Sequence, residues 1–249
     1  YITAIAIYVR FFPTSGPNKK KVDFSTRLSL FRDIWHVLLI FFIVIGGIYL
    51  GWFTPTEGAA VGAAGTGLIA VFNKNFSLDN FFEVINDTAV TTAMIFLVLL
   101  GAEFFNSFIA ISRVTNILSE TILGYNYSPF TIVAIILLIY IFLGCLMDSL
   151  AMILLTIPVF FPVIIQLDFG MSYEETAIWF GILTLIVVEV GLITPPVGLN
   201  AFIINKIAGD IPIKETFKGV LPFLISDFLR VILLFAFPGI TLFLVRLLY

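Results

Sequence analysis

The stretch Gly191-Leu-Ile-Thr-Pro-Pro-Val-Gly-Leu-Asn200 interrupts a long apolar segment of the sequence. Each of the adjacent prolines, Pro195 and Pro196, lacks a backbone N–H and clashes with the preceding helical turn, so the pair cannot lie within an intact helix. The pattern predicts a membrane helix over 176–208 that is broken near its middle. Because unpaired backbone is tolerated at membrane depth only inside protein or beside a watery cavity, such breaks are typical of binding sites in secondary transporters.

The composition is that of an all-α integral membrane protein. Apolar residues make up 60% of the chain, charged residues make up 12%, and the mean hydropathy is +1.12. Several uninterrupted apolar runs reach about 20 residues, the length that crosses a bilayer, so membrane lipid is expected around the chain. The net charge of −3 indicates no nucleic-acid partner. A single cysteine, Cys145, excludes an internal disulfide.

Charged loops separate the segments of the first half of the chain. Residues 1–12 are interpreted as the end of a preceding transmembrane helix, because this apolar run begins without an initiator Met or a basic segment. Residues 13–33 are basic, and the positive-inside rule predicts a cytoplasmic linker there. The region 34–128 is expected to hold scaffold and arm helices, with spans over 34–53 and 88–111 and a turn over 73–87.

The region 129–166 has two apolar arms around a polar break at Asp148-Ser149. Each arm is near the lower limit for a full crossing. We predict a re-entrant hairpin that enters and leaves from the outside, although two full crossings would fit the loop charges equally well. The acidic loop 167–175 is expected outside and the basic loop 206–218 inside. The last transmembrane helix is predicted over 220–245.

The two breaks are the best candidates for an ion site. The ends of half-helices expose carbonyl groups that attract a cation and N–H groups that attract an anion. Loop carbonyls and Ser or Thr hydroxyls supply the oxygen ligands that sodium requires. Asp148 adds a formal charge, and it is expected either to bind the ion or to cap the second arm.

Three other acidic residues lie in or beside apolar segments, and each is a candidate ion or proton carrier. Glu57 follows Thr-Pro-Thr and is expected to cap the next helix, whereas Glu189 lies just before the broken stretch. Glu103 has no sequence context that favours a function. No Ser-His pairing or Gly-rich phosphate loop indicates an enzyme.

Three motifs then point to a family. They are Gly51-Trp-Phe-Thr-Pro-Thr-Glu-Gly-Ala-Ala60, Gly144-Cys-Leu-Met-Asp-Ser-Leu-Ala-Met152 and the broken stretch, in this order. Together they resemble the C-terminal half of the large membrane (permease) subunit of the tripartite ATP-independent periplasmic (TRAP) transporters. The resemblance covers nearly the whole chain from about residue 40. The tip Asp148-Ser149-Leu150 differs from the Asp-Pro-Thr that is frequent in that family.

The resemblance implies an elevator-type repeat in the bacterial inner membrane, with hairpin 129–166 and broken helix 176–208. It implies sodium-coupled uptake of an organic acid, with no organic cofactor. The implied partners are a small four-helix membrane subunit, a periplasmic substrate-binding protein and the first half of the large subunit. The implied sodium site comprises Asp148, Ser149, Leu150, Gly191, Thr194 and Val197, and the helix break beside the organic anion comprises Pro195, Pro196, Gly198 and Asn200.

Two alternatives stay open at this point. A two-component sodium/carboxylate carrier of the wider ion-transporter superfamily would need no binding protein. A non-transporting membrane scaffold would need no pair of helix breaks, so the proline motif argues against it. The sequence does not identify the substrate, and sialic acid, C4-dicarboxylates and keto acids all remain possible.

Overall fold

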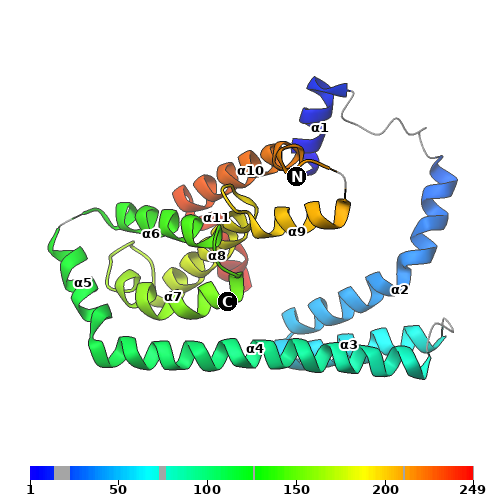
Figure 1. Cartoon of the computed structure of the whole chain (residues 1–249), viewed down its shortest axis with the longest axis horizontal. Helices are drawn as coiled ribbons and strands as arrows, with labels where there is room; N and C mark the ends of the chain where they lie inside the picture. Colours follow the sequence, from blue (N-terminus) through cyan, green and yellow to red (C-terminus); the bar gives the residue numbers. More distant parts are fainter. Residues whose placement is uncertain (14–22, 73–76, 126, 210, 249) are drawn as a thin grey trace. The chain divides into compact units, whose positions relative to one another are not determined.

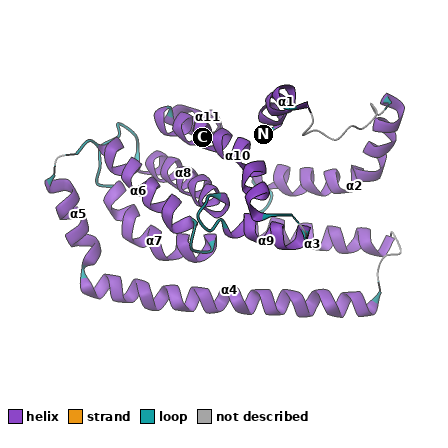
Figure 2. Ribbon diagram, turned by 45° about the horizontal axis from the view of Figure 1, so that its top comes forward, coloured by secondary structure: helices purple, strands orange, loops and turns teal. Residues whose placement is uncertain are grey.

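The computed structural model describes residues 1–13, 23–72, 77–125, 127–209 and 211–248, and 85% of these residues are helical. The part of the chain that the structure describes contains no strand (Figure 2). The basic residues Lys19, Lys20 and Lys21, which support the predicted cytoplasmic linker, lie outside the described residues. The chain divides into two compact units, Tyr1–Gly16 with Met94–Tyr249, and Pro17–Ala93.

The smaller unit is built on two successive helices that are joined by a short turn and pack against each other. Glycines on the second helix face side chains of the first: a Cβ on Gly58 would meet Ile48 Cδ1 at 3.0 Å, and one on Gly65 would meet Ile40 at 3.3 Å. Small residues thus allow close contact, as expected for helices in lipid. The elements are α2 (Phe24–Tyr49), α3 (Pro55–Phe72) and the start of α4 (Leu78–Ser112).

The larger unit contains every remaining helix (Figure 1). Its core lies between three helices, α6, α7 and α8, whose largest fully buried side chains are Trp179, Tyr140, Phe180 and Met152. The elements are α1 (Ile2–Phe11), the rest of α4, α5 (Val114–Gly124), α6 (Pro129–Gly144), α7 (Ser149–Ile164), α8 (Tyr173–Ile193), α9 (Leu199–Ala208), α10 (Ile213–Ala236) and α11 (Pro238–Leu248).

An aromatic cluster around Trp179 joins α6, α8 and α10. The Trp179 ring lies 5.3 Å from Phe169, 6.0 Å from Phe130 and 6.1 Å from Phe235, measured between ring centroids. Its Nε1–H donates to the carbonyl of Leu234 at 3.0 Å. The buried indole therefore has its polar atom satisfied, which is what a Trp in an apolar core requires.

A second polar contact joins the two arms of the predicted hairpin. Thr156 on α7 forms a hydrogen bond of 2.8 Å with the phenol oxygen of Tyr140 on α6, and its hydroxyl also lies 2.6 Å from the Met152 carbonyl. Tyr140 is fully buried. The contact satisfies a phenol that would otherwise be unpaired inside the core, and it fixes how α6 and α7 face each other.

Three helix boundaries differ from the sequence predictions. α4 begins at Leu78, within the predicted turn over 73–87, where the Ser77 hydroxyl accepts a hydrogen bond from the Asn80 N–H at 3.1 Å and so caps the helix. α2 begins at Phe24, inside the predicted linker 13–33. The predicted helix 220–245 is divided at Phe237, because Pro238 has no N–H and pushes the preceding residue out of helical conformation.

Among the described residues, three helices are long and apolar enough to cross a membrane: α4, α8 and α10. Each arm of the predicted hairpin, α6 and α7, has 16 residues. At a rise of about 1.5 Å per residue each arm is about 24 Å long, less than the roughly 30 Å of a bilayer's hydrocarbon core.

Candidate functional site

The first break is the turn from Cys145 to Asp148, between α6 and α7. Asp148 has extended backbone and is the N-cap of α7: its Oδ2 accepts hydrogen bonds from the N–H groups of Leu150 at 3.1 Å and Ala151 at 3.3 Å. This is the capping role that the sequence analysis considers as one of two possibilities. Ser149 is the first residue of the helix that Asp148 caps.

The second break runs from Thr194 to Gly198, between α8 and α9. Thr194 has extended backbone, with φ −89° and ψ 135°, and the Pro195–Pro196 peptide bond is cis. Gly198 adopts the left-handed conformation with φ 57°, and a Cβ there would meet the Phe217 ring at 2.9 Å, so only glycine suits the position. The break divides the predicted helix unequally, into 21 residues of α8 and 10 of α9.

The two prolines leave the carbonyl of Leu192 without a helical donor. In an α-helix this carbonyl would accept from residue 196, or from residue 195 in a tighter turn, and both are prolines. Leu192 is only 4% exposed. A buried carbonyl without a donor is a strong candidate to bind a cation. Leu192 is not among the predicted ligands, although the position of the two prolines was enough to identify it.

Thr194 satisfies the two carbonyls that precede Leu192. Its N–H donates to the carbonyl of Gly191 at 3.0 Å, and its hydroxyl donates to that of Val190 at 2.5 Å. Since the hydroxyl proton is used in this bond, the lone pairs of Thr194 Oγ1 remain available to a cation. The carbonyl of the predicted ligand Gly191 therefore already accepts one hydrogen bond. The Thr194 hydroxyl oxygen still has lone pairs that can bind a sodium ion.

The structure brings the two breaks together where α6 and α8 end. A Cβ on Gly191 would lie 2.7 Å from Gly144 Cα, and a Cβ on Gly144 would lie 3.0 Å from Gly191 Cα. The sulfur of Cys145 lies 3.2 Å from the carbonyl oxygen of Ile141 and 3.7 Å from that of Pro195, and its single S–H is shared between these two acceptors. Backbone atoms thus make the contact at Gly144 and Gly191, and we refer to Ile141–Cys145 with Val188–Pro195 as the crossing.

Not all predicted site residues meet there. In the described part of the chain, no hydrogen bond joins the hairpin-tip residues Asp148, Ser149 and Leu150 to the stretch 191–200. Val197 and Asn200 are partly buried, and Asn200 lies in the first turn of α9. The structure therefore brings together the residues just before each break rather than those just after the first one.

The partial charges at the crossing favour a cation. Both helix ends that meet are C-terminal ends, which carry partial negative charge from free carbonyls. The N-terminus of α7 is occupied by the carboxylate of Asp148, but α9 begins at Leu199 after the N-cap residue Gly198, which has no side chain to cap it. The first N–H groups of α9 are accordingly suited to an anion.

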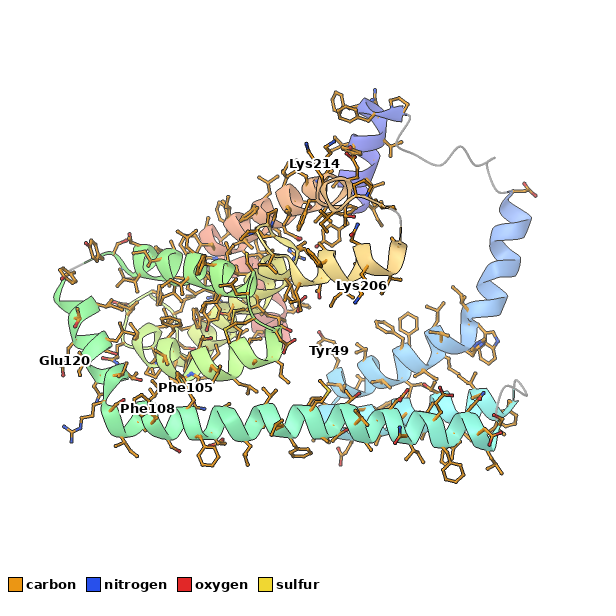
Figure 3. The ribbon with its side chains drawn as sticks, viewed as in Figure 1. Tyr49, Phe105, Phe108, Glu120, Lys206 and Lys214 are labelled. Atoms are coloured by element: carbon orange, nitrogen blue, oxygen red, sulfur yellow. The ribbon has the colours of Figure 1, made fainter. Side chains whose placement is uncertain are left out.

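A turn between α9 and α10 follows the second break. Asn205 Nδ2 donates to the carbonyl of Ile211 at 2.7 Å and to Thr216 Oγ1 at 2.8 Å, which closes the turn. Lys206 lies on α9 and Lys214 at the start of α10, on either side of this turn (Figure 3). Both lysines fall within 206–218, the range that was predicted as a cytoplasmic loop, but both are helical.

The sequence analysis missed one buried ionic group in α10. Asp227 is 3% exposed, and its carboxylate accepts from Arg230 at 2.9 Å and from the Tyr1 hydroxyl at 2.6 Å. A charged pair three residues apart on an apolar helix is a recognisable signal, since such residues lie on one helical face. Because the pair neutralises itself, it ties α1 to α10 without leaving an unpaired buried charge.

The other acidic candidates do not contribute to the crossing. Glu57 Oε2 accepts hydrogen bonds from the Thr54 backbone N–H at 2.8 Å and hydroxyl at 2.9 Å. The predicted capping role of Glu57 is therefore present. Glu103 and Glu189 are exposed.

The apolar helices among the described residues, together with the family match that follows, point to a multi-pass membrane protein. Over residues 1–240 the chain matches the sequence profile of the tripartite ATP-independent periplasmic transporter, DctM component. The chain belongs to this family, as its three motifs predicted. The family consists of transporter permeases and is not a family of enzymes.

Characterised relatives are similar along most of this chain. The sialic acid TRAP transporter large permease protein SiaM of Vibrio cholerae is 33% identical over 85% of the chain and 48% of its own length. The sialic acid permease SiaT of Haemophilus influenzae is 30% identical over 93% of the chain and 37% of its own length. The C4-dicarboxylate permease DctM of Pseudomonas aeruginosa is 28% identical over 97% and 55% respectively. The chain thus spans about half the length of these relatives or less.

Proposed function

We propose that this chain is half of the large subunit of a sodium-coupled secondary transporter that takes up an organic acid. The observation that carries the proposal is the crossing, where two helix breaks far apart in the sequence meet through their backbones. A membrane scaffold has no need to expose free carbonyls inside a helix bundle, because each unpaired polar group there is costly. A transporter needs such groups to bind an ion reversibly.

The sodium ion would be held by oxygen atoms at the two breaks. The carbonyl oxygen of Leu192 and the hydroxyl oxygen of Thr194 are the ligand atoms whose lone pairs remain available after the hydrogen bonds are formed. The carbonyl of Val197 and the backbone of the hairpin tip, at Ser149 and Leu150, complete the proposed set. Neutral oxygen donors beside two partly negative helix ends suit a hard monovalent cation that must also be released.

The organic anion would bind beside the start of α9. Its uncapped N-terminus offers N–H groups and a partial positive charge. The break residues Pro195, Pro196, Gly198 and Asn200 lie within a few positions of this helix start. Sialic acid and C4-dicarboxylates, which appear in the names of the relatives, share a carboxylate. A carboxylate is therefore the group proposed to meet this helix end.

The proposed topology places α6 and α7 as a re-entrant hairpin in the inner membrane. Arms of about 24 Å are shorter than a bilayer core, which supports a hairpin that returns to the side it entered. The lysines around the α9–α10 turn support a cytoplasmic position for that turn. In the proposed elevator mechanism, the hairpin and the broken helix move together as one repeat.

The proposed partners are the first half of the large subunit, a small four-helix membrane subunit and a periplasmic binding protein. The test is uptake of radiolabelled sialic acid and of succinate, in separate assays, by the full-length permease and small subunit in proteoliposomes, with the binding protein outside. We expect uptake with an inward sodium gradient and none with an equal potassium gradient. Sodium-driven uptake without the binding protein would instead support the two-component alternative. Sodium-independent uptake would overturn the proposed coupling.

A further inference from the structure

Gly144 and Gly191 form the closest approach between α6 and α8. A Cβ on Gly191 would lie 2.7 Å from Gly144 Cα and 3.0 Å from the Ile141 carbonyl oxygen. A Cβ on Gly144 would lie 3.0 Å from Gly191 Cα and 3.1 Å from the Val188 carbonyl oxygen. All of these are backbone atoms, so no rotamer change can make room for even one methyl group.

Glycine at these positions is not explained by helix formation. Gly191 lies inside α8, where glycine is less favourable than alanine, and Gly144 is the last residue of α6. Neither has a left-handed φ angle, unlike Gly198. The contact between the two backbones is therefore the property that requires glycine at both positions.

The position of this contact connects it to the proposed ion site. Gly144 is the last residue of α6, and Gly191 directly precedes Leu192, whose carbonyl lacks a helical donor. Moving α6 away from α8 would change the distance between the two C-terminal helix ends and thus the field that a cation experiences between them.

We propose that Gly144 and Gly191 are positioning residues for the coupling ion: their backbone contact holds the hairpin against the helix break and so sets the affinity for sodium. This inference rests on the proposed sodium coupling. It adds that the affinity depends on how closely two helix backbones approach, and not only on the oxygen atoms that bind the ion.

The test compares three alanine variants of the full-length permease, reconstituted with its partner subunits. For Gly191→Ala and Gly144→Ala we expect the sodium concentration for half-maximal uptake to rise about tenfold, which corresponds to about 1.4 kcal/mol. Gly181→Ala is the matched control, because it lies in the same helix and its Cβ would meet nothing within 4 Å. We expect its sodium curve to stay within about twofold of the wild type.

The maximal rate at saturating sodium separates positioning from general damage. Loss of folded transporter lowers this rate without moving the sodium concentration for half-maximal uptake, so a shifted curve identifies an effect on the ion site. An unshifted curve in both crossing variants, with sodium-dependent wild-type uptake, would overturn the inference and leave the proposed function intact. Wild-type uptake that ignores sodium would overturn the proposed function itself.

Cys145 provides a second readout if the alanine variants fail to accumulate. Its thiol is buried in the crossing, beside the carbonyl of Pro195. In a complex from which every cysteine except Cys145 has been removed, with both glycines of the crossing intact, we expect sodium to slow the reaction of this thiol with a maleimide at least severalfold, because the ion holds the crossing closed. A labelling rate that sodium leaves unchanged would contradict a crossing that responds to the ion.

Discussion

The α6–α8 crossing and the α2–α3 pair both place glycines between helices, but the atoms opposite those glycines differ. Opposite Gly58 and Gly65 on α3 lie the ends of isoleucine side chains, which can change rotamer. Opposite Gly191 lie the Cα of Gly144 and a carbonyl oxygen, which cannot move without moving a helix. Whether a glycine in a membrane helix can be replaced by a larger residue thus depends on which atoms lie opposite it.

The two regions also differ in how their helices end. α3 continues without a break past its glycines, so its backbone hydrogen bonds stay within the helix. α6 and α8 end at their contact, and carbonyls become free at the point where the backbones meet. The α2–α3 pair is a packing contact, whereas the crossing combines close packing with unsatisfied polar groups.

The largest effect on sodium-driven uptake is expected when the helix break of the crossing is removed, so that α8 continues without a break as α3 does. In the double variant Pro195→Ala with Pro196→Ala, two new N–H groups can bond the carbonyls of Gly191 and Leu192, and each alanine favours helix over proline by about 3 kcal/mol. We expect sodium-driven uptake to fall at least about 100-fold, equivalent to about 2.7 kcal/mol, with normal amounts of protein in the membrane.

The measurement is initial uptake by the full complex, normalised to the amount of permease in the proteoliposomes. Gly181→Ala serves again as the control on α8. Normal uptake by the double variant would show that the break does not depend on its prolines, and the contrast with α3 would lose its basis.

A smaller effect should follow from removing one hydroxyl of the break. Thr194→Val keeps the shape of the side chain but loses the oxygen, so we expect the sodium concentration for half-maximal uptake to rise about fivefold, which is about 1 kcal/mol. Thr194→Ser keeps the oxygen and should stay close to the wild type. Identical sodium curves for the two variants would remove this side chain from the proposed site while leaving its carbonyl there.

The smallest effect is expected on α3. For Gly58→Ala, the gain in helix propensity of up to about 1 kcal/mol offsets a small adjustment of Ile48, so the change in unfolding free energy should stay within about 1 kcal/mol. For Gly144→Ala we expect a loss of about 1–3 kcal/mol from overpacking. Thermal unfolding of the two purified variants in the same detergent measures both, and equal losses would erase the difference between the two regions.

Local features of the structure could be predicted because their causes are local in the sequence. The break at Thr194–Gly198 follows from two prolines, and the caps at Asp148 and Glu57 follow from a polar residue just before or within the first turn of a helix. The Leu192 carbonyl could have been identified in the same way. By contrast, the start of α4 was mispredicted, because charged residues were interpreted as a turn although Ser77 can cap a helix that begins there.

The sequence by itself determined that this is a helical membrane protein of a transporter family, with two helix breaks of defined chemistry. These properties depend on composition and on hydrogen bonds between residues a few positions apart. Only the tertiary structure decided that the breaks meet, through Gly144 with Gly191 and through Cys145 with Pro195, fifty positions apart. The physical reason is that such a contact depends on how α6, α7 and α8 pack around their shared core, and that packing is a property of many side chains together.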